Sequence, residues 1–201
     1  MMVLRSAPAS PFVRKVRIAA ALLGLDKEIE LRATDTAKAE ADFVRDNPLG
    51  KIPVLIDESG MEYYDSPVIV EYLDHRAGGG KIIPRDGKAR FETLRLQALA
   101  DGIADASLLQ VYEGRYRPAD KQVQSWLDMQ ASKVARGLSV LEAAPPKMGA
   151  TPDAGQIALA CALGYLDLRF KGDWRAKHPR LVAWLDAFEA EVPAFAATKA
   201  A

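Results

Sequence analysis

The stretch KIPVLIDESGMEYY, residues 51–64, contains the pattern that decides the fold. Two apolar runs, Val54–Asp57 and Met61–Tyr64, flank Glu58-Ser59-Gly60, and this arrangement predicts two strands joined by a hairpin turn. Residues from Ser66 to about Arg76 follow with helical spacing. A hairpin that leads into a helix is typical of the end of a small α/β domain.

Upstream of this hairpin, strand-like and helical runs alternate. The expected strands are Met2–Arg5 and Glu28–Arg32, and the expected helices are Pro11–Gly24 and a shorter segment, Thr36–Asp46. Pro11 suits a first helical turn, so Ser10 is the predicted N-cap. The order βαβαββα therefore predicts an α/β domain over residues 1–77.

The first expected helix carries one apolar stripe. Its apolar positions recur at steps of three and four residues: Phe12, Val16, Ala19, Ala20 and Leu23. The basic positions that fall mostly outside the stripe are Arg14, Lys15 and Arg17. This spacing predicts a buried apolar face and a solvated basic face.

A glycine-rich linker, residues 78–88, separates this domain from residues 89–201, in which no strand pattern is found. Long periodic segments cover about 89–117, 118–144, 153–170 and 178–191 and predict an all-α domain. Asp153 stands three residues before Gln156 at the start of an apolar run, which predicts a capping box.

The composition excludes several classes of protein. The 27 basic and 27 acidic side chains balance, so no nucleic-acid partner is expected. No apolar run approaches the ~20 residues that span a bilayer, and the first residues lack an export signal, so we expect a cytoplasmic protein without a membrane partner. The single cysteine, Cys161, and two distant histidines favour neither a disulfide nor a metal site. Cys161 and the three tryptophans, Trp126, Trp174 and Trp184, are expected to be packing residues.

Three short segments of the α/β domain are candidates for ligand binding. Ser10 follows the first strand, at the sheet edge where open α/β sheets bind ligands, and the helix dipole favours an anion beside it. Pro53 opens a strand and is a plausible cis proline, although trans proline is much commoner. Ser66 is the predicted N-cap of the next helix, which again suits an anion. Each segment is also explained by local structure alone.

Taken in order, SPFVRKVR (10–17), NPLGKIPVL (47–55) and YDSPVIVEYL (64–73) resemble the glutathione S-transferase superfamily. The resemblance is to bacterial serine-type members, or to omega-, zeta- or beta-like ones, and it extends over nearly the whole chain. It implies a thioredoxin-like N-terminal domain, a helical C-terminal domain and a homodimer with one glutathione site per subunit.

The resemblance also implies roles for individual residues. Ser10 would donate to the glutathione sulfur, and the cis Pro53 would let the backbone of Ile52 pair with the cysteinyl part. Glutathione would further contact Asp65 and Ser66 at its γ-glutamyl end, with Phe12, Lys51 and Lys38 nearby. Asp101 or Asp105 could reach the partner subunit's glutathione, and the candidates for the second-substrate pocket are Tyr112, Arg115 and Tyr116. Many relatives have Glu at the position of Asp65.

The implied activity is a glutathione transferase of the detoxification type, in which the bound thiolate attacks a small electrophile without a metal. Ser10 has no neighbouring base in the sequence, which argues against a serine-hydrolase nucleophile. Two alternatives remain open at this point. One is glutathione-dependent peroxide reduction or isomerisation on the same site. The other is a non-enzymatic glutathione-binding or assembly module, since one fold can serve several functions.

Overall fold

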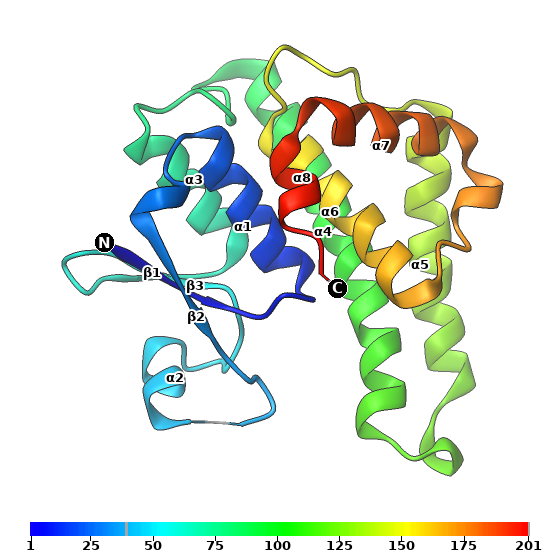
Figure 1. Cartoon of the computed structure of the whole chain (residues 1–201). Helices are drawn as coiled ribbons and strands as arrows, with labels where there is room; N and C mark the ends of the chain where they lie inside the picture. The colour runs from blue at the N-terminus through cyan, green and yellow to red at the C-terminus, as the bar shows by residue number, and fades with distance from the viewer. Residues whose placement is uncertain (39, 201) are drawn as a thin grey trace.

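The computed structural model describes residues 1–38 and 40–200 and consists of a sheet with its helices beside a larger group of helices (Figure 1). Residues 39 and 201, which fall inside the predicted Thr36–Asp46 helix and at the end of the predicted all-α domain, lie outside the described residues. The first part contains β1 (Met2–Ser6), α1 (Pro11–Leu22), β2 (Ile29–Ala33), α2 (Ala41–Asp46), β3 (Val54–Ile56), β4 (Glu62–Tyr63) and α3 (Ser66–Arg76). The predicted order βαβαββα is confirmed.

The four strands form one sheet in the order β2-β1-β3-β4. β1 pairs in parallel with β2, and β3 pairs antiparallel with both β1 and β4. Leu4 of β1 is fully buried in the apolar core. Since successive strand residues point to opposite faces, Arg5 faces the other side, where its guanidinium binds Asp46 of α2 at 2.6 Å. The two faces of β1 thus hold the core on one side and α2 on the other.

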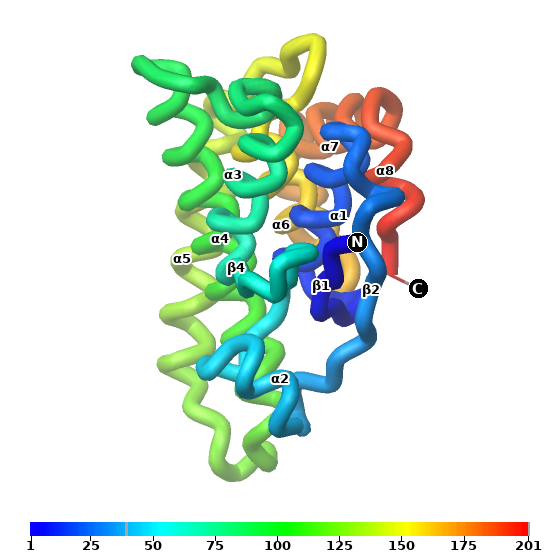
Figure 2. Tube along the Cα trace, turned by 90° about the vertical axis from the view of Figure 1, so that its left-hand side faces the viewer, coloured from blue at the N-terminus to red at the C-terminus, as the bar shows by residue number. Residues whose placement is uncertain are grey.

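The second part is helical, as expected. Within the described residues it contains α4 (Gly87–Tyr116), α5 (Gln124–Ala143), α6 (Ala154–Phe170), α7 (Pro179–Glu191) and α8 (Pro193–Ala197), with short 3₁₀ turns at Ala119–Lys121 and Arg175–Lys177. A further 3₁₀ turn, Asp26–Glu28, lies in the first part. Figure 2 shows α4 and α5 running side by side along one flank. The most buried helix is α6, which packs against α1, α4 and α7. No helix in the described residues is both long and apolar enough to cross a membrane.

The structure corrects one local prediction and adds one helix that was not predicted. Helix α2 begins at Ala41 and not at Thr36, because the Asp35 carboxylate accepts the amide of Ala37 at 3.0 Å and holds this segment as a turn. The chain also forms α8, which the periodicity did not indicate. A five-residue helix that starts at a proline is too short for a periodic pattern to predict.

The predicted solvated face of α1 is wrong for two of its three residues. Arg14 is 8% exposed and Lys15 only 1% exposed, while Arg17 is half-buried. The reason is that α1 packs against α3 on one side and against α6 and α8 on the other (Figure 1). A single apolar stripe is the pattern of a helix with one packing face, whereas α1 has two.

The predicted capping box at α6 is confirmed and gives a stability prediction. Asp153 Oδ1 accepts the Gln156 amide at 2.9 Å, Gln156 Oε1 accepts the Asp153 amide at 2.9 Å, and Thr93 donates to Asp153 Oδ2 at 2.8 Å. We expect Asp153→Ala to lower the free energy of unfolding in urea by about 1–2 kcal/mol, since a lost N-cap costs about this much. Asp153→Asn, which keeps an acceptor, should lose far less; equal losses would contradict the capping role.

Candidate functional site

Ser10 lies at the N-terminus of α1, as the sequence pattern predicted. Its Oγ accepts a hydrogen bond from the amide of Val13 at 3.3 Å, and Pro11 is the first helical residue. Because the hydroxyl accepts from the helix, its own proton remains available to a ligand at the helix end. Both the hydroxyl proton and the positive end of the helix dipole favour an anion at this point.

The Ile52–Pro53 peptide bond is cis, as the resemblance implied. The loop before it is held by Asn47, whose amide group donates to the carbonyl of Lys51 at 2.9 Å. Ile52 itself lies outside β3 and is half-buried. Within the described residues its amide and its carbonyl make no hydrogen bond to the rest of the backbone. These two groups are therefore available to an extended ligand.

The predicted N-cap of α3 is shifted by one residue. The cap is Asp65, which has an extended backbone and makes no side-chain cap hydrogen bond, and Ser66 is the first helical residue. Ser66 is 2% exposed, while Asp65 is exposed. Because the Asp65 carboxylate does not cap the helix, both this carboxylate and the first amides of α3 can contact a ligand.

Acidic residues of α4 lie close to these loops. Lys15 binds Asp101, with its Nζ 2.8 and 2.7 Å from the two carboxylate oxygens. Burial raises the pKa of Asp101 despite the attraction of Lys15. Burial also raises the pKa of Asp105, and the neighbouring carboxylates of Asp101 and Asp65 raise it further, against the attraction of Lys51. Asp101 thus binds a residue of its own chain, whereas Asp105 is partly desolvated by its neighbours but keeps an exposed side chain.

Three other predicted residues lie at the far end of α4. Tyr112 and Tyr116 contact each other edge to face, with ring centroids 5.1 Å apart, and the guanidinium of Arg115 lies 5.4 Å from the Tyr112 ring. The two tyrosines line a surface pocket with Trp126, and Ser10 is not part of its lining. Trp126 is 39% exposed and is not a packing anchor, unlike the buried Trp174 and Trp184. Lys38 is exposed, with its Nζ 3.7 Å from Asp35.

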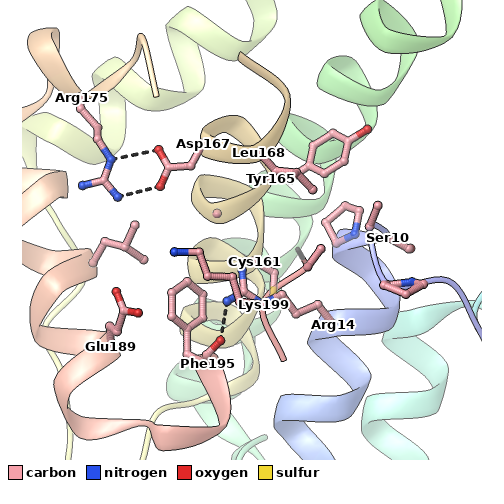
Figure 3. A pocket seen from close by; sticks show the side chains of 16 residues that line it. Ser10, Arg14, Cys161, Tyr165, Asp167, Leu168, Arg175, Glu189, Phe195 and Lys199 are labelled. Carbon is pink, nitrogen blue, oxygen red and sulfur yellow. Dashed lines mark hydrogen bonds and ion pairs between the residues drawn. The ribbon is translucent and has the colours of Figure 1, made fainter. Parts of the chain in front are cut away.

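Ser10 opens instead on a cavity of about 260 Å³ between α1, α6 and the C-terminal segment (Figure 3). Its lining includes Ser10, Arg14, Cys161, Tyr165, Phe195 and Lys199. Burial raises the pKa of the Cys161 thiol to about 12, which fits the predicted inert thiol. The sequence pattern gave no signal for Tyr165, Phe195 or Lys199, because their place beside Ser10 depends on how α6 and α8 pack against α1.

The chain thus consists of a thioredoxin-like domain, with the helix start at Ser10 and the cis bond at Pro53, followed by a helical domain. Two family models match the chain. The N-terminal domain of glutathione S-transferases matches residues 9–76, and their C-terminal domain matches residues 124–187. An uncharacterised GST-like protein of Escherichia coli, YibF, is 38% identical over 86% of each chain. The protein belongs to the glutathione S-transferase family.

Solved structures agree with this assignment over the whole chain. A glutathione transferase family member from Pseudomonas fluorescens, solved with bound glutathione, is 42% identical, and each chain covers 100% of the other with a TM-score of 0.94. A second structure from the same organism, with bound S-(propanoic acid)-glutathione, is 41% identical with a TM-score of 0.89. A glutathione S-transferase from Methylobacillus flagellatus with bound glutathione is 37% identical, with full coverage and a TM-score of 0.91.

Proposed function

We propose that this protein is a glutathione transferase in which Ser10 stabilises the thiolate of bound glutathione for attack on a small electrophile. The observation that carries the proposal is the position of the Ser10 hydroxyl, at the N-terminus of α1 and on the wall of a cavity. A scaffold protein needs neither this cavity nor the open backbone groups of Ile52. The relatives solved with bound glutathione support glutathione as the ligand.

Glutathione would lie across the carboxyl edge of the sheet. Its cysteinyl backbone would pair with the free amide and carbonyl of Ile52, beside the cis Pro53. Its γ-glutamyl carboxylate would meet Ser66 and the first amides of α3, which no side chain caps, and its ammonium would meet Asp65. Lys51, with Lys38 further out, would attract the glycine carboxylate. Phe12, half-buried at the start of α1, would flank the bound peptide.

Catalysis would rest on lowering the pKa of the bound thiol. Only the thiolate is a competent nucleophile, and an ordinary thiol has a pKa of about 8.5. A hydrogen bond from Ser10 Oγ and the N-terminus of α1 both favour the charged sulfur. The thiol proton passes to solvent, the sulfur electron pair forms the new carbon–sulfur bond, and the electrons that this displaces leave with a leaving group or move onto the substrate.

The electrophile would enter the cavity beside Ser10. The Pseudomonas fluorescens relative that holds S-(propanoic acid)-glutathione supports a short substituent on the sulfur. Tyr112, Arg115 and Tyr116 would form only the outer approach to the site, since the pocket of the two tyrosines does not include Ser10. Such a reaction suits detoxification of small electrophiles in the cytoplasm.

A homodimer belongs to the same proposal. Exposed apolar side chains that an interface would cover include Met61 beside β4, Val68 of α3 and Phe91 of α4, which are 56%, 47% and 70% exposed. In such a dimer Asp105, exposed and close to Asp65 and Lys51, would be better placed than the ion-paired Asp101 to reach the partner's glutathione. Light scattering after size exclusion tests this part: a monomer at working concentration would rule it out.

The role of Ser10 is tested through the ionisation of bound glutathione. In wild-type protein, the ultraviolet absorbance of the bound thiolate should titrate well below the pKa of free glutathione. Ser10→Ala should raise this pKa by about one unit, or about 1.4 kcal/mol, because one hydrogen bond to the charged sulfur is lost. The rate of conjugation near neutral pH should fall in proportion to the thiolate.

Ser6→Ala is the matched control. The Ser6 hydroxyl donates to the carbonyl of Arg32 at 3.4 Å within the sheet and does not line the cavity, so its loss should leave the thiol pKa unchanged. If glutathione binds with an unshifted pKa in wild-type protein, Ser10 only caps α1. If millimolar glutathione does not bind at all, the protein is a non-enzymatic module.

A further inference from the structure

Arg14 is a buried cation that has no carboxylate partner among the described residues. It follows Ser10 by four residues on α1, is 8% exposed and lines the same cavity (Figure 3). Its Nη2 donates to the carbonyl of Phe195 at 2.5 Å, and its Nε donates to Thr198 Oγ1 at 3.3 Å. The Phe195 ring lies 3.8 Å from the guanidinium carbon. Within residues 1–38 and 40–200, no carboxylate lies within ion-pair distance of Arg14 and Nη1 has no acceptor.

The other buried cations of α1 and β1 are paired. Arg5 binds Asp46 at 2.6 Å, and Lys15 binds Asp101 at 2.7 Å. A buried charge is costly unless an opposite charge or several hydrogen bonds compensate for it. Burial indeed lowers the pKa of Arg14. Among the described residues Arg14 therefore has one donor group, Nη1, without an acceptor and a positive charge without a carboxylate partner, and an anion would satisfy both.

The cavity wall leaves room for the guanidinium, and its other charged groups balance one another. A Cβ at position 164 would lie 2.5 Å from Arg14 Nη1, so the glycine of α6 lets this group lie at the wall. Asp167 is already bound by Arg175 through hydrogen bonds of 2.9 and 2.6 Å (Figure 3). Of the remaining charged groups in the lining, Lys199 is positive and Glu189 is negative. The charge of Arg14 therefore makes the sum of these lining charges positive, which favours an anion.

We propose that Arg14 binds a carboxylate of the second substrate, so that the preferred electrophiles are short carboxylic acids with a reactive carbon near the carboxyl group. This inference rests on the proposed transferase function. Ser10 and Arg14 line the same cavity of about 260 Å³. The sulfur at Ser10, the reactive carbon and the carboxylate at Arg14 must therefore fit into this volume together, which favours a short acid.

For an α,β-unsaturated acid the step balances without a further reactant. The thiolate sulfur forms a bond to the β-carbon, and the electron pair of the double bond moves to the α-carbon, next to the carboxylate. The α-carbon then takes a proton from solvent, which replaces the proton that the thiol lost on binding. The charged guanidinium at the carboxylate stabilises the extra charge that develops there, by a charge-assisted hydrogen bond.

The test compares the binding of two matched products by calorimetry. S-(2-carboxyethyl)glutathione carries the acid, and S-(2-carbamoylethyl)glutathione carries a neutral amide of the same shape; glutathione itself is measured beside them. Wild-type protein should bind the acid about tenfold more tightly than the amide, which corresponds to about 1.4 kcal/mol. Arg14→Gln should remove this preference and leave the affinity for glutathione unchanged.

Two further variants keep the test decisive. Gly164→Ala retains the charge of Arg14 but displaces its guanidinium group. This variant should therefore reduce the preference for the acid even if Arg14→Gln does not fold. Arg175→Gln removes a cavity cation that Asp167 already neutralises, and the preference should persist. Equal binding of acid and amide by wild-type protein that binds glutathione would overturn this inference and leave the proposed function standing. Failure to bind glutathione would overturn both.

Discussion

Lys15→Met is expected to lower the free energy of unfolding by about 3–5 kcal/mol, because it removes one partner of a buried ion pair. Lys15 is 1% exposed, and its Nζ lies 2.8 and 2.7 Å from the two oxygens of Asp101, whose side chain is 18% exposed. The pair joins α1 of the first part to α4 of the second. In the variant, the Asp101 carboxylate keeps its burial but loses its counter-ion. Urea unfolding at neutral pH measures the loss.

The control is an exposed ion pair on α4. Lys88 lies 3.5 Å from Glu92, with its side chain 89% exposed, so Lys88→Met should cost less than about 1 kcal/mol. Replacing both members of the buried pair, as Lys15→Met with Asp101→Leu, should recover most of the stability, because no buried charge is then left alone. A double variant as unstable as Lys15→Met would show that the loss comes from packing.

The loss of unfolding free energy in the Lys15→Met variant should also depend on pH. Burial already raises the pKa of Asp101 in the folded protein above its ordinary value, and removal of Lys15 raises that pKa further. The folded state then binds more protons than the unfolded state between the two pKa values, so stability rises as the pH falls through that window. The difference between wild type and Lys15→Met should therefore shrink toward acid pH.

Local patterns in the sequence were enough to predict most of the fold. The hairpin of β3 and β4, the helix start at Ser10 and the capping box of Asp153 each depend on a few neighbouring residues, and all three are found in the structure. The cis bond at Pro53 was predicted by the resemblance and not by spacing, since most prolines of this kind are trans.

Features that depend on packing between distant segments could not be predicted in this way. Arg14 was predicted to be solvated, but its guanidinium binds the carbonyl of Phe195, 181 residues away in the sequence. The cavity beside Ser10 likewise exists only because α6 and the C-terminal segment pack against α1. Helical spacing identifies a face of a helix, but it does not tell how many neighbours that helix has.

The second large effect concerns Gly155, at the point where α6 approaches α4. A Cβ at this position would lie 2.7 Å from the backbone oxygen of Thr93 and 2.8 Å from the Cβ of Leu96. Neither atom can move without moving the backbone of α4. Overpacking of a tight contact typically costs 1–3 kcal/mol, and these rigid neighbours favour the upper end, so we expect Gly155→Ala to lower the free energy of unfolding by about 3 kcal/mol.

Two other helical glycines give a graded control for this prediction. At Gly137 the added Cβ would meet only side-chain atoms, of Ile103 at 2.8 Å and of Leu99 at 3.6 Å. A side chain can turn away, so the loss should be smaller. At Gly102 nothing lies within 4 Å, and Ala should raise stability by up to about 1 kcal/mol, because alanine is the better helix former. Urea unfolding of the three variants should follow this order. If Gly155→Ala were as stable as Gly102→Ala, the contact between α4 and α6 would be loose enough to accept a methyl group. Close packing of these two helices would then not be a main source of stability for the second part of the protein.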